Sequence, residues 1–237
     1  MNKAIVKKLD HLFYAHTKDR WDDKIFRQEI LSEIKPDHVV LDVGAGRGRI
    51  LEMGFKGHCK KIYGVDPDEG IHENPLIDEG HLGLGDSMPF FQDNYFDLIF
   101  CDNVLEHVEN PTLFYKEIKR VLKDGGVFLA KTPNKYHYMP IIARCTPTGF
   151  HKFYNKLRGR DYEDTFPTFY RANTRRQYKK LAKENEMELV STKFFAGRPE
   201  YLRIFFPTYI VGILYERTVN LLNLNFFKTI IISKMKK

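Results

Sequence analysis

A glycine-rich run at residues 39–48 has the residue types and spacing that point most directly to chemistry. It reads Val-Val-Leu-Asp-Val-Gly-Ala-Gly-Arg-Gly, so Gly44, Gly46 and Gly48 follow an apolar strand pattern. Glycines let the backbone turn tightly and approach a ligand closely. A dinucleotide fingerprint has the spacing GxGxxG, and its third glycine would fall on Arg49. The GxGxG spacing therefore indicates a nucleotide-like ligand and disfavours a pyrophosphate bound to a helix N-terminus.

Acidic and polar residues follow three further strand patterns. Asp66 ends the second, and its carboxylate can accept hydrogen bonds from both hydroxyls of a ribose, in an NAD site as well as in an adenosylmethionine site. Asp86 follows the third strand and can accept from an adenine amine, with Met88 against the ring. The segment 101–108, Cys-Asp-Asn-Val-Leu-Glu-His-Val, follows the fourth. Ligands of doubly wound sheets bind at these strand ends.

The elements that must position these residues alternate along the chain. This alternation predicts βαβ units and an α/β fold with a mostly parallel sheet. Helical patterns are expected at residues 3–15, 22–34, 49–55, 112–122 and 174–186. Strand patterns are expected at 38–41, 61–65, 81–84, 96–101, 127–131, 187–196 and 200–206.

Five motifs stand in order along the chain. They are Leu-Asp-Val-Gly-Ala-Gly-Arg-Gly, Gly-Val-Asp, Gly-Asp-Ser-Met-Pro-Phe, Phe-Asp-Leu-Ile-Phe-Cys-Asp-Asn-Val-Leu-Glu-His-Val and Leu-Lys-Asp-Gly-Gly. In these motifs the chain resembles the class I small-molecule methyltransferases, and within them the group that contains the ubiquinone and menaquinone biosynthesis enzymes. The resemblance covers about residues 20–135 and is weaker to about 195.

The resemblance implies a fold, a methyl donor and a set of roles. The fold is a Rossmann-like doubly wound seven-stranded sheet, mostly parallel, with helices on both faces and N-terminal helices. The donor is S-adenosylmethionine, which leaves as S-adenosylhomocysteine. Its amino-acid part would be bordered by Asp42, Gly44, Gly46 and Gly48. Asp66 would hold its ribose, and its adenine would lie beside Pro67, Asp86 and Ser87, with Met88 nearby. Asn103 and Val104 would line the site close to its sulfonium. Tyr14 and Trp21 would either cover the donor or belong to the core.

Methyl transfer from a sulfonium is an in-line displacement, so the protein mainly has to align the reacting atoms. A hydroxyl acceptor also needs a base to take its proton. The candidates are His107 after the fourth strand and His137 after the fifth, with Tyr136 and Tyr138 as weaker ones. Alternatively, His107 only supports its loop.

The acceptor is less well specified. The (D/N)PP(Y/F) element of many enzymes that methylate nucleic-acid amines is absent at 101–104, which disfavours DNA adenine but leaves RNA open. Residues 134–173 are expected to be a lid or acceptor-binding insertion. Aromatic and basic side chains alternate in 150–176 and suit stacked bases, a phosphorylated small molecule or a membrane: Phe150, His151, Lys152, Phe153, Tyr154, Lys156, Arg158, Arg160, Tyr170, Arg171, Arg175 and Arg176.

Charge and hydropathy separate the two halves of the chain. Residues 1–130 hold 17 Lys and Arg against 23 Asp and Glu, whereas 131–237 hold 21 against 8. We expect a methyltransferase domain at 1–206 and an apolar, basic-ended helical extension at 207–237 that lies on an anionic membrane, or else packs on its own domain or in a dimer. Three scattered cysteines predict no disulfide framework and a reducing, cytoplasmic setting, peripheral to a membrane if the extension binds one. No metal-binding cluster is expected.

The sequence therefore predicts an enzyme that moves a methyl group from S-adenosylmethionine to a small or lipid-linked acceptor. The favoured acceptor is a hydroxyl of a quinone precursor, glycan or glycolipid. An RNA methyltransferase, a nicotinamide-dependent oxidoreductase and a non-catalytic adapter on the same fold are the alternatives, with a nucleic-acid partner disfavoured and the oligomeric state open.

Overall fold

The computed structural model describes residues 3–15, 21–145 and 167–237, and the chain divides into two compact units. We call them the sheet unit and the helical unit. The sheet unit comprises residues 23–132, 168–193 and 231–237, and the helical unit comprises 1–22, 133–167 and 194–230.

Seven strands form one sheet in the order β3-β2-β1-β4-β5-β7-β6. The pairs β1–β2, β1–β4, β2–β3 and β4–β5 are parallel, which confirms the predicted α/β class. The chain reverses its direction of strand addition between β1 and β4, so the ends of these strands form the switch point at which such sheets bind ligands. The strands are β1 (Val39–Val43), β2 (Lys61–Asp66), β3 (Glu79–Leu82), β4 (Phe96–Asp102), β5 (Leu122–Pro133), β6 (Glu188–Phe195) and β7 (Ile230–Lys236).

Strand β7 corrects the predicted C-terminal extension. The Gly125 amide near the start of β5 donates to the Lys237 carbonyl at 3.0 Å, and the Lys237 amide donates to Gly126 at 3.2 Å. The start of β5 thus lies beside the end of β7, and the two strands run in opposite directions. The run Ile230–Ile232 is buried, as β-branched residues in a sheet commonly are. Because the helix and this strand are both strongly apolar and only a short connection separates them, the sequence pattern merged the two.

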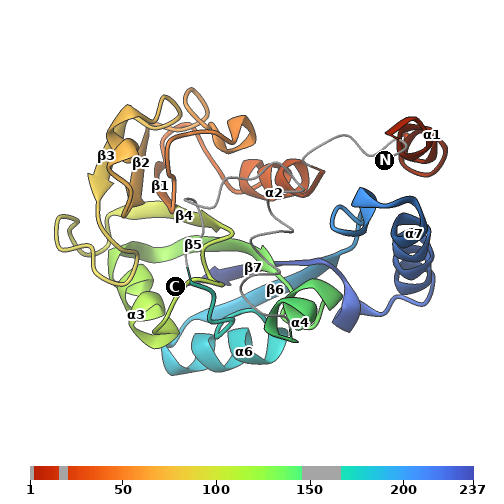
Figure 1. Ribbon diagram of the computed structural model, residues 1–237. Helices are drawn as coiled ribbons and strands as arrows, with labels where there is room; N and C mark the ends of the chain where they lie inside the picture. Colours follow the sequence, from red (N-terminus) through yellow and green to blue (C-terminus); the bar gives the residue numbers. More distant parts are fainter. Residues whose placement is uncertain (1–2, 16–20, 146–166) are drawn as a thin grey trace. The chain divides into compact units, whose positions relative to one another are not determined.

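Three helices of the sheet unit cover both faces of the sheet, with α3 (Pro111–Val121) and α6 (Arg175–Glu184) on one face and α2 (Trp21–Leu31) on the other (Figure 1). Helix α3 begins where the side chain of Asn110 accepts from the Leu113 amide, and Pro111 occupies its first turn. Thr174 caps α6 by accepting from the Gln177 amide. Fully buried aromatic rings form the core between these helices and the sheet, among them Phe26 of α2, Phe100 of β4 and Phe128 of β5.

Two further predicted elements were wrong. The helix expected at 49–55 is a single 3-10 turn, η1 (Leu51–Met53), because Gly48 and Gly54 enclose too few residues for a stable helix. The strand expected at 200–206 is also a 3-10 turn, η4 (Leu202–Ile204), between Pro199 and the start of α7. Another short 3-10 helix, η2 (Glu69–Glu73), follows β2.

The helical unit contains α1 (Lys3–Tyr14), α4 (Tyr138–Cys145), α7 (Phe206–Leu221) and the 3-10 turn η5 (Asn225–Phe227). Helix α1 lies beside α7 (Figure 1), and the Tyr14 hydroxyl donates to Glu216 at 3.0 Å. Trp21 packs so closely on Gly197 that an added Cβ there would lie 2.5 Å from the indole. Tyr14 and Trp21 thus both pack within this unit. Among the residues that the structure describes, no helix has the length and apolarity needed to span a membrane.

Candidate functional site

The glycine-rich loop that follows β1 has a backbone that other residues adopt with difficulty. Gly44, Gly46 and Gly48 have φ angles of +82°, +51° and +70°. The Gly44 amide donates to the Val65 carbonyl at 2.7 Å, which carries the chain from β1 across the end of β2. A Cβ on Gly44 would lie 2.3 Å from a methyl group of Val104. The predicted tight turn is confirmed, whereas the predicted close approach to a ligand stays a prediction.

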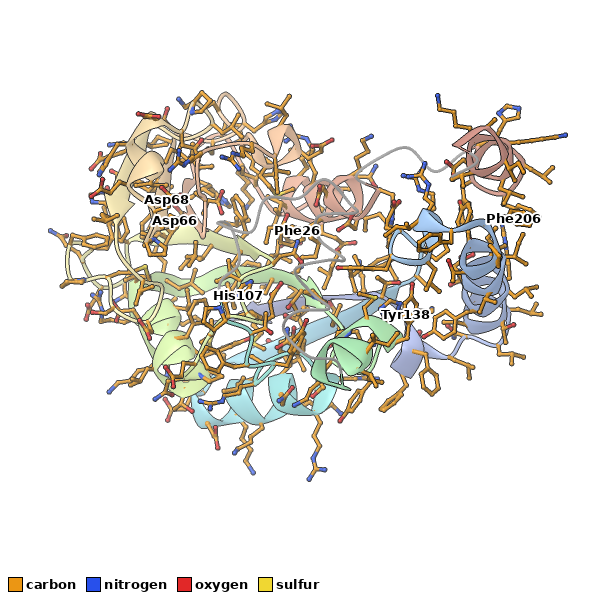
Figure 2. The ribbon with its side chains drawn as sticks, viewed as in Figure 1. Phe26, Asp66, Asp68, His107, Tyr138 and Phe206 are labelled. Atoms are coloured by element: carbon orange, nitrogen blue, oxygen red, sulfur yellow. The ribbon has the colours of Figure 1, made fainter. Side chains whose placement is uncertain are left out.

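Asp66 at the end of β2 holds this loop by its backbone. One carboxylate oxygen accepts from the Gly46 amide and the other from the Asp68 amide, both at 2.8 Å. Burial raises the pKa of Asp66, and the two amide bonds partly offset this effect. Each carboxylate oxygen can accept more than one hydrogen bond, so the group retains capacity for a ligand hydroxyl. Asp66 and Asp68 both lie at this end of β2 (Figure 2).

Asn74 is a second clamp on the loop, which the sequence analysis missed. Its side-chain amide donates to the carbonyls of Ala45 at 2.9 Å and Gly46 at 3.0 Å. Its oxygen accepts from the Leu76 amide at 2.8 Å, so every part of the side chain is engaged. The only available signal was the Asn-Pro pair at 74–75, which marks a turn and gives no hint of its partner.

An ion pair joins the same two loops at the surface. Arg47 donates from Nη2 to one oxygen of Asp68 at 3.0 Å and from Nε to the other at 3.2 Å. The hydrogen bonds from Arg47 hold the pKa of Asp68 below its usual range. Because both side chains are accessible to solvent, the ion pair mainly fixes the positions of the two loops and adds little to the stability of the fold.

Carboxylates gather below the loop. Asp42 is 5% exposed, and its pKa is raised well above the usual value by burial and by the nearby Asp102 and Asp66. Lys131 at the end of β5 is completely buried, contacts Asp23 of α2, and lies 3.0 Å from Asp102. Asp102 belongs to the segment expected after the fourth strand, but Lys131 and Asp23 were not predicted as site residues. The only signal was a lysine directly after the apolar run 127–130.

The segment after β4 lies against the glycine loop, as expected from the strand order. Asn103 has a φ of +55°, and its amide donates to the Lys131 carbonyl at 2.9 Å. Val104 occupies the space over Gly44. His107 is half-buried, and its amide closes a turn on the Val104 carbonyl at 2.8 Å. Asn103, Val104 and His107 thus belong to the same strand-end region as Asp42 and Asp66, where Figure 2 also labels His107.

Glu106, beside His107, is a buried carboxyl group that sequence analysis passed over. It accepts a hydrogen bond from the Thr132 hydroxyl at 2.9 Å, and Thr132 in turn accepts one from the Asn173 side chain. The Glu106 carbonyl accepts from the Phe169 amide at 2.7 Å, which attaches the last part of the expected insertion. Burial raises the pKa of Glu106 to about 7.

The predicted adenine contacts have different surroundings. Pro67 and Ser87 are exposed and Asp86 is half-buried, so all three have surface available to a ligand. Met88 is 0% exposed, and its amide donates to Glu117 at 2.7 Å. The Met88 side chain therefore belongs to the core and has no free surface for a ring.

His137 belongs to the helical unit, whereas the other predicted site residues belong to the sheet unit. It is 4% exposed, and the rings of Tyr138 and Tyr215 lie 4.0 Å and 6.0 Å from it between centroids. Burial lowers the pKa of His137 to about 4. Eight of the aromatic and basic residues predicted to meet an acceptor lie outside the described residues: Phe150, His151, Lys152, Phe153, Tyr154, Lys156, Arg158 and Arg160.

Two further features of the described residues, a surface cavity and the arrangement of potential metal ligands, add nothing to the strand-end region. A surface cavity of about 240 Å³ lies where β1, β4 and β5 begin, beside His38, Asp97 and Lys123, and contains none of the predicted residues. Within the described ranges, no group of three or more His, Cys, Asp or Glu side chains is arranged to hold a metal ion.

Comparison with known proteins agrees with the geometry. Residues 41–130 match the family model described as a methyltransferase domain. The chain is 32% identical over 113 residues to a probable S-adenosylmethionine-dependent methyltransferase of Mycolicibacterium smegmatis, over 46% of this chain and 42% of that protein. It is 27% identical over 154 residues to the mitochondrial ubiquinone biosynthesis O-methyltransferase of Dictyostelium discoideum, over 54% of this chain and 47% of that protein. The chain thus spans less than half the length of each relative.

Solved structures share the fold. The crystal structure of a SAM-dependent methyltransferase from Archaeoglobus fulgidus superposes with a TM-score of 0.62 at 17% identity, and covers 98% of this chain and 99% of that one. At this identity the similarity is one of architecture.

Proposed function

We propose that this chain, which carries a class I S-adenosylmethionine-dependent methyltransferase domain, transfers a methyl group from S-adenosylmethionine to a hydroxyl of a small or lipid-linked acceptor. A quinone precursor, a glycan and a glycolipid are the acceptor classes we favour. The observation that carries the proposal is the glycine-rich loop at the β1–β4 switch point, whose backbone is held by hydrogen bonds with Asp66 and Asn74.

The residues at this site suit the donor. A Cβ on Gly46 would meet only the Asp66 carboxylate, at 3.9 Å, so open space lies over the middle of the loop. Asp42, Asp66 and Asp102 lie close enough that Asp66 and Asp102 raise the pKa of Asp42. A ligand with a sulfonium, an ammonium group and ribose hydroxyls offers cations to these carboxylates and donors to Asp66. The excess of carboxylates fits such a cation better than it fits a pyrophosphate.

The roles that we propose for the residues are those implied by the resemblance, and this placement supports them. S-Adenosylmethionine supplies an activated methyl group when bound. Asp66 holds the ribose hydroxyls, with Pro67, Asp86 and Ser87 around the adenine. The loop at 44–48 and Asp42 face the amino-acid part, and Asn103 and Val104 face the reacting end. Alignment of the reacting atoms by such fixed groups contributes roughly 7–11 kcal/mol to lowering the barrier.

A hydroxyl acceptor must lose its proton, and His107 is the base that we propose. It lies on the segment that also carries Asn103 and Val104, and it is only half-buried. His137 is the second candidate, since a histidine with a pKa of about 4 is neutral near pH 7 and able to accept a proton. The relative named as a ubiquinone biosynthesis O-methyltransferase supports a hydroxyl of a quinone precursor as the first acceptor to try.

The decisive experiment measures ligand binding and turnover separately. Melting temperatures of the full chain with S-adenosylmethionine, S-adenosylhomocysteine and NAD give the donor class, and we expect the first two to raise the melting temperature and NAD to leave it unchanged. Incubation with methyl-labelled donor and extracts then shows whether label enters lipid, glycan, RNA or soluble metabolites. Stabilisation by NAD alone would overturn the donor assignment. Label in RNA would move the acceptor to that alternative, and binding without any labelled product would favour an adapter.

A further inference from the structure

Large apolar side chains are exposed along one side of the helical unit. They lie on α7, at its start and in the turn that follows it. Phe206 marks the beginning of this surface in Figure 2. We call it the α7 face, and it consists of Phe205, Phe206, Val211, Leu214, Leu221, Leu222, Leu224, Phe226 and Phe227, each between 37% and 86% exposed. Single exposed apolar residues are ordinary, but a contiguous group of this kind marks an interaction surface.

Helix α7 buries a side of mixed character, on which Ile213 and Val219 lie with Glu216, and it exposes large apolar side chains on another side. Glu216 is 6% exposed and accepts from Tyr14 of α1 at 3.0 Å and from the side chain of Asn220. Tyr209 is fully buried, and its hydroxyl donates to Asp10 of α1 at 2.5 Å. A helix on the surface of a water-soluble protein normally exposes mainly charged and polar residues. The contacts to α1, both polar and hydrophobic, therefore leave the apolar Val211, Leu214 and Leu221 exposed.

The spacing of the outward residues gives this face its shape. Val211, Leu214 and Leu221 follow one another at intervals of three and seven, so they lie along one side of the helix. Their exposed fractions are 62%, 63% and 86%. The stripe ends directly in the apolar turn 222–227, which extends the same surface beyond the helix.

Hydrogen bonds and a ring contact fix the conformation of the turn at residues 222–227. Asn134, which is 1% exposed, donates from its side-chain amide to the carbonyls of Phe226 at 2.9 Å and Lys228 at 2.8 Å. The ring of Tyr136 stacks on Phe226 with 4.0 Å between centroids. Phe226 and Phe227 are thus exposed on a backbone that is already fixed. Binding to these two side chains would therefore cost little conformational entropy.

Charge identifies the partner. The three segments of the helical unit hold 15 Lys and Arg against 8 Asp and Glu, a balance of +7, whereas those of the sheet unit hold 23 of each. The whole net positive charge of the chain thus lies in the unit that bears the α7 face. On α1, beside α7, the side chains of Lys7, Lys8 and His11 are exposed, as is the apolar Leu12. Apolar side chains next to exposed lysines are the combination that binds an anionic bilayer surface.

We propose that the α7 face, with the lysines of α1, docks the protein on an anionic lipid bilayer. The apolar side chains enter the interface between head groups and acyl chains, and Lys7 and Lys8 meet the anionic head groups. This inference does not depend on the methyl transfer proposed above, because it concerns the helical unit alone and its test requires no donor and no turnover.

The test is sedimentation of the full chain with vesicles of phosphatidylcholine alone or with added phosphatidylglycerol. The variant Leu214→Ser/Leu221→Ser/Phe226→Ser removes three exposed side chains of the face, and a matched control, Leu82→Ser/Leu113→Ser/Val190→Ser, removes three exposed ones from the sheet unit. We expect binding to the anionic vesicles that the first variant weakens at least tenfold and the control leaves unchanged. Lys7→Glu or Lys8→Glu should each weaken it by about fivefold or more, since one basic residue near the surface is worth about 1 kcal/mol.

Other outcomes would overturn the proposal. One is absence of sedimentation with anionic vesicles, and another is binding that the α7 variant and the control reduce equally. Light scattering of the unliganded chain gives a third: a dimer that Leu214→Ser/Leu221→Ser dissociates would assign the face to a second copy. Circular dichroism of each variant confirms that loss of binding is not loss of fold.

Discussion

A Cβ atom added to Gly48 would lie 2.3 Å from the side-chain oxygen of Asn74, and the φ of Gly48 is +70°. The Gly48→Ala variant therefore has both backbone strain and a steric conflict with the residue that clamps the loop. Gly57 separates the two effects, since its φ is +82° but nothing lies within 4 Å of an added Cβ. We expect Gly57→Ala to lower the free energy of unfolding by about 1 kcal/mol and Gly48→Ala by about 2–4 kcal/mol. Urea denaturation measures both, and equal losses would contradict the contact.

Asp66 is predicted to affect donor binding more than stability. Replacement by Ala removes the acceptors of the Gly46 and Asp68 amides together with those offered to a ribose. We expect Asp66→Ala to weaken S-adenosylhomocysteine binding by about 10–100-fold, since a hydrogen bond to a charged group is worth about 1.5–3 kcal/mol. Calorimetric titration gives the affinity, with the highly exposed Asp124, changed to Ala, as the control. An unchanged affinity would remove Asp66 from the donor site.

Glu106 is predicted to make stability depend on pH. Its pKa is raised from 4.5 to about 7 in the folded chain, so folding favours the protonated form. The stabilisation is complete below pH 4.5 and is lost as the pH rises through 7, a difference of roughly 3 kcal/mol. Glu106→Gln keeps an acceptor for Thr132 but cannot ionise. Relative to the wild type it should gain stability between pH 5 and pH 8 in urea denaturation, and a constant difference would contradict the raised pKa.

The two histidines are predicted to differ in their effect on turnover. If His107 takes the proton of a hydroxyl acceptor, His107→Gln should lower kcat by about 10²–10⁴-fold and leave donor affinity unchanged. His137→Gln should then have a small effect, whereas the reverse result would place the base in the helical unit. A base with the pKa of His137 would also keep kcat constant down to about pH 4. If neither variant is impaired, the acceptor atom does not need a base.

Lys131 is predicted to be the most sensitive single position for folding. Its buried ammonium contacts Asp23 and Asp102, so Lys131→Met leaves two buried carboxylates without their cation. Breaking a buried ion pair on one side costs about 3–5 kcal/mol. The triple variant Lys131→Met/Asp23→Asn/Asp102→Asn should recover most of this loss in thermal unfolding. Failure to recover it would show that packing of the lysine stem, not its charge, is what stabilises the strand end.

The sequence predicted the parts of the site that have a regular pattern. Two patterns identified its residues. The GxGxG spacing after an apolar strand indicated Gly44, Gly46 and Gly48, and the position at the end of the second apolar strand indicated Asp66. Asn74 and Lys131 were missed, because the hydrogen-bond partners of a loop asparagine and the charge partners of a strand lysine come from distant segments. Contacts of this kind depend on the tertiary arrangement and leave no local periodicity.

The fold was predicted to a similar degree. The alternation of strands and helices predicted strands β1 to β6, together with α1, α2, α3 and α6. The error at 230–236 arose because Ile230 to Ile232 read as the end of an apolar helix, although the chain turns at η5 and enters the sheet. Only the pairing with β5 distinguishes the two interpretations, and pairing partners cannot be read from hydropathy.

The place of β7 between β5 and β6 has a consequence for synthesis on the ribosome. β6 lies at the edge of the sheet and its neighbour there is β7, so it has no partner until residues 230–236 have been made. At ordinary translation rates of about 5–20 residues per second, the interval between the end of β6 and the end of β7 lasts about 2–8 s. During that time β5 and β6 both present unpaired edges, and the nascent chain is most exposed to aggregation and to chaperones.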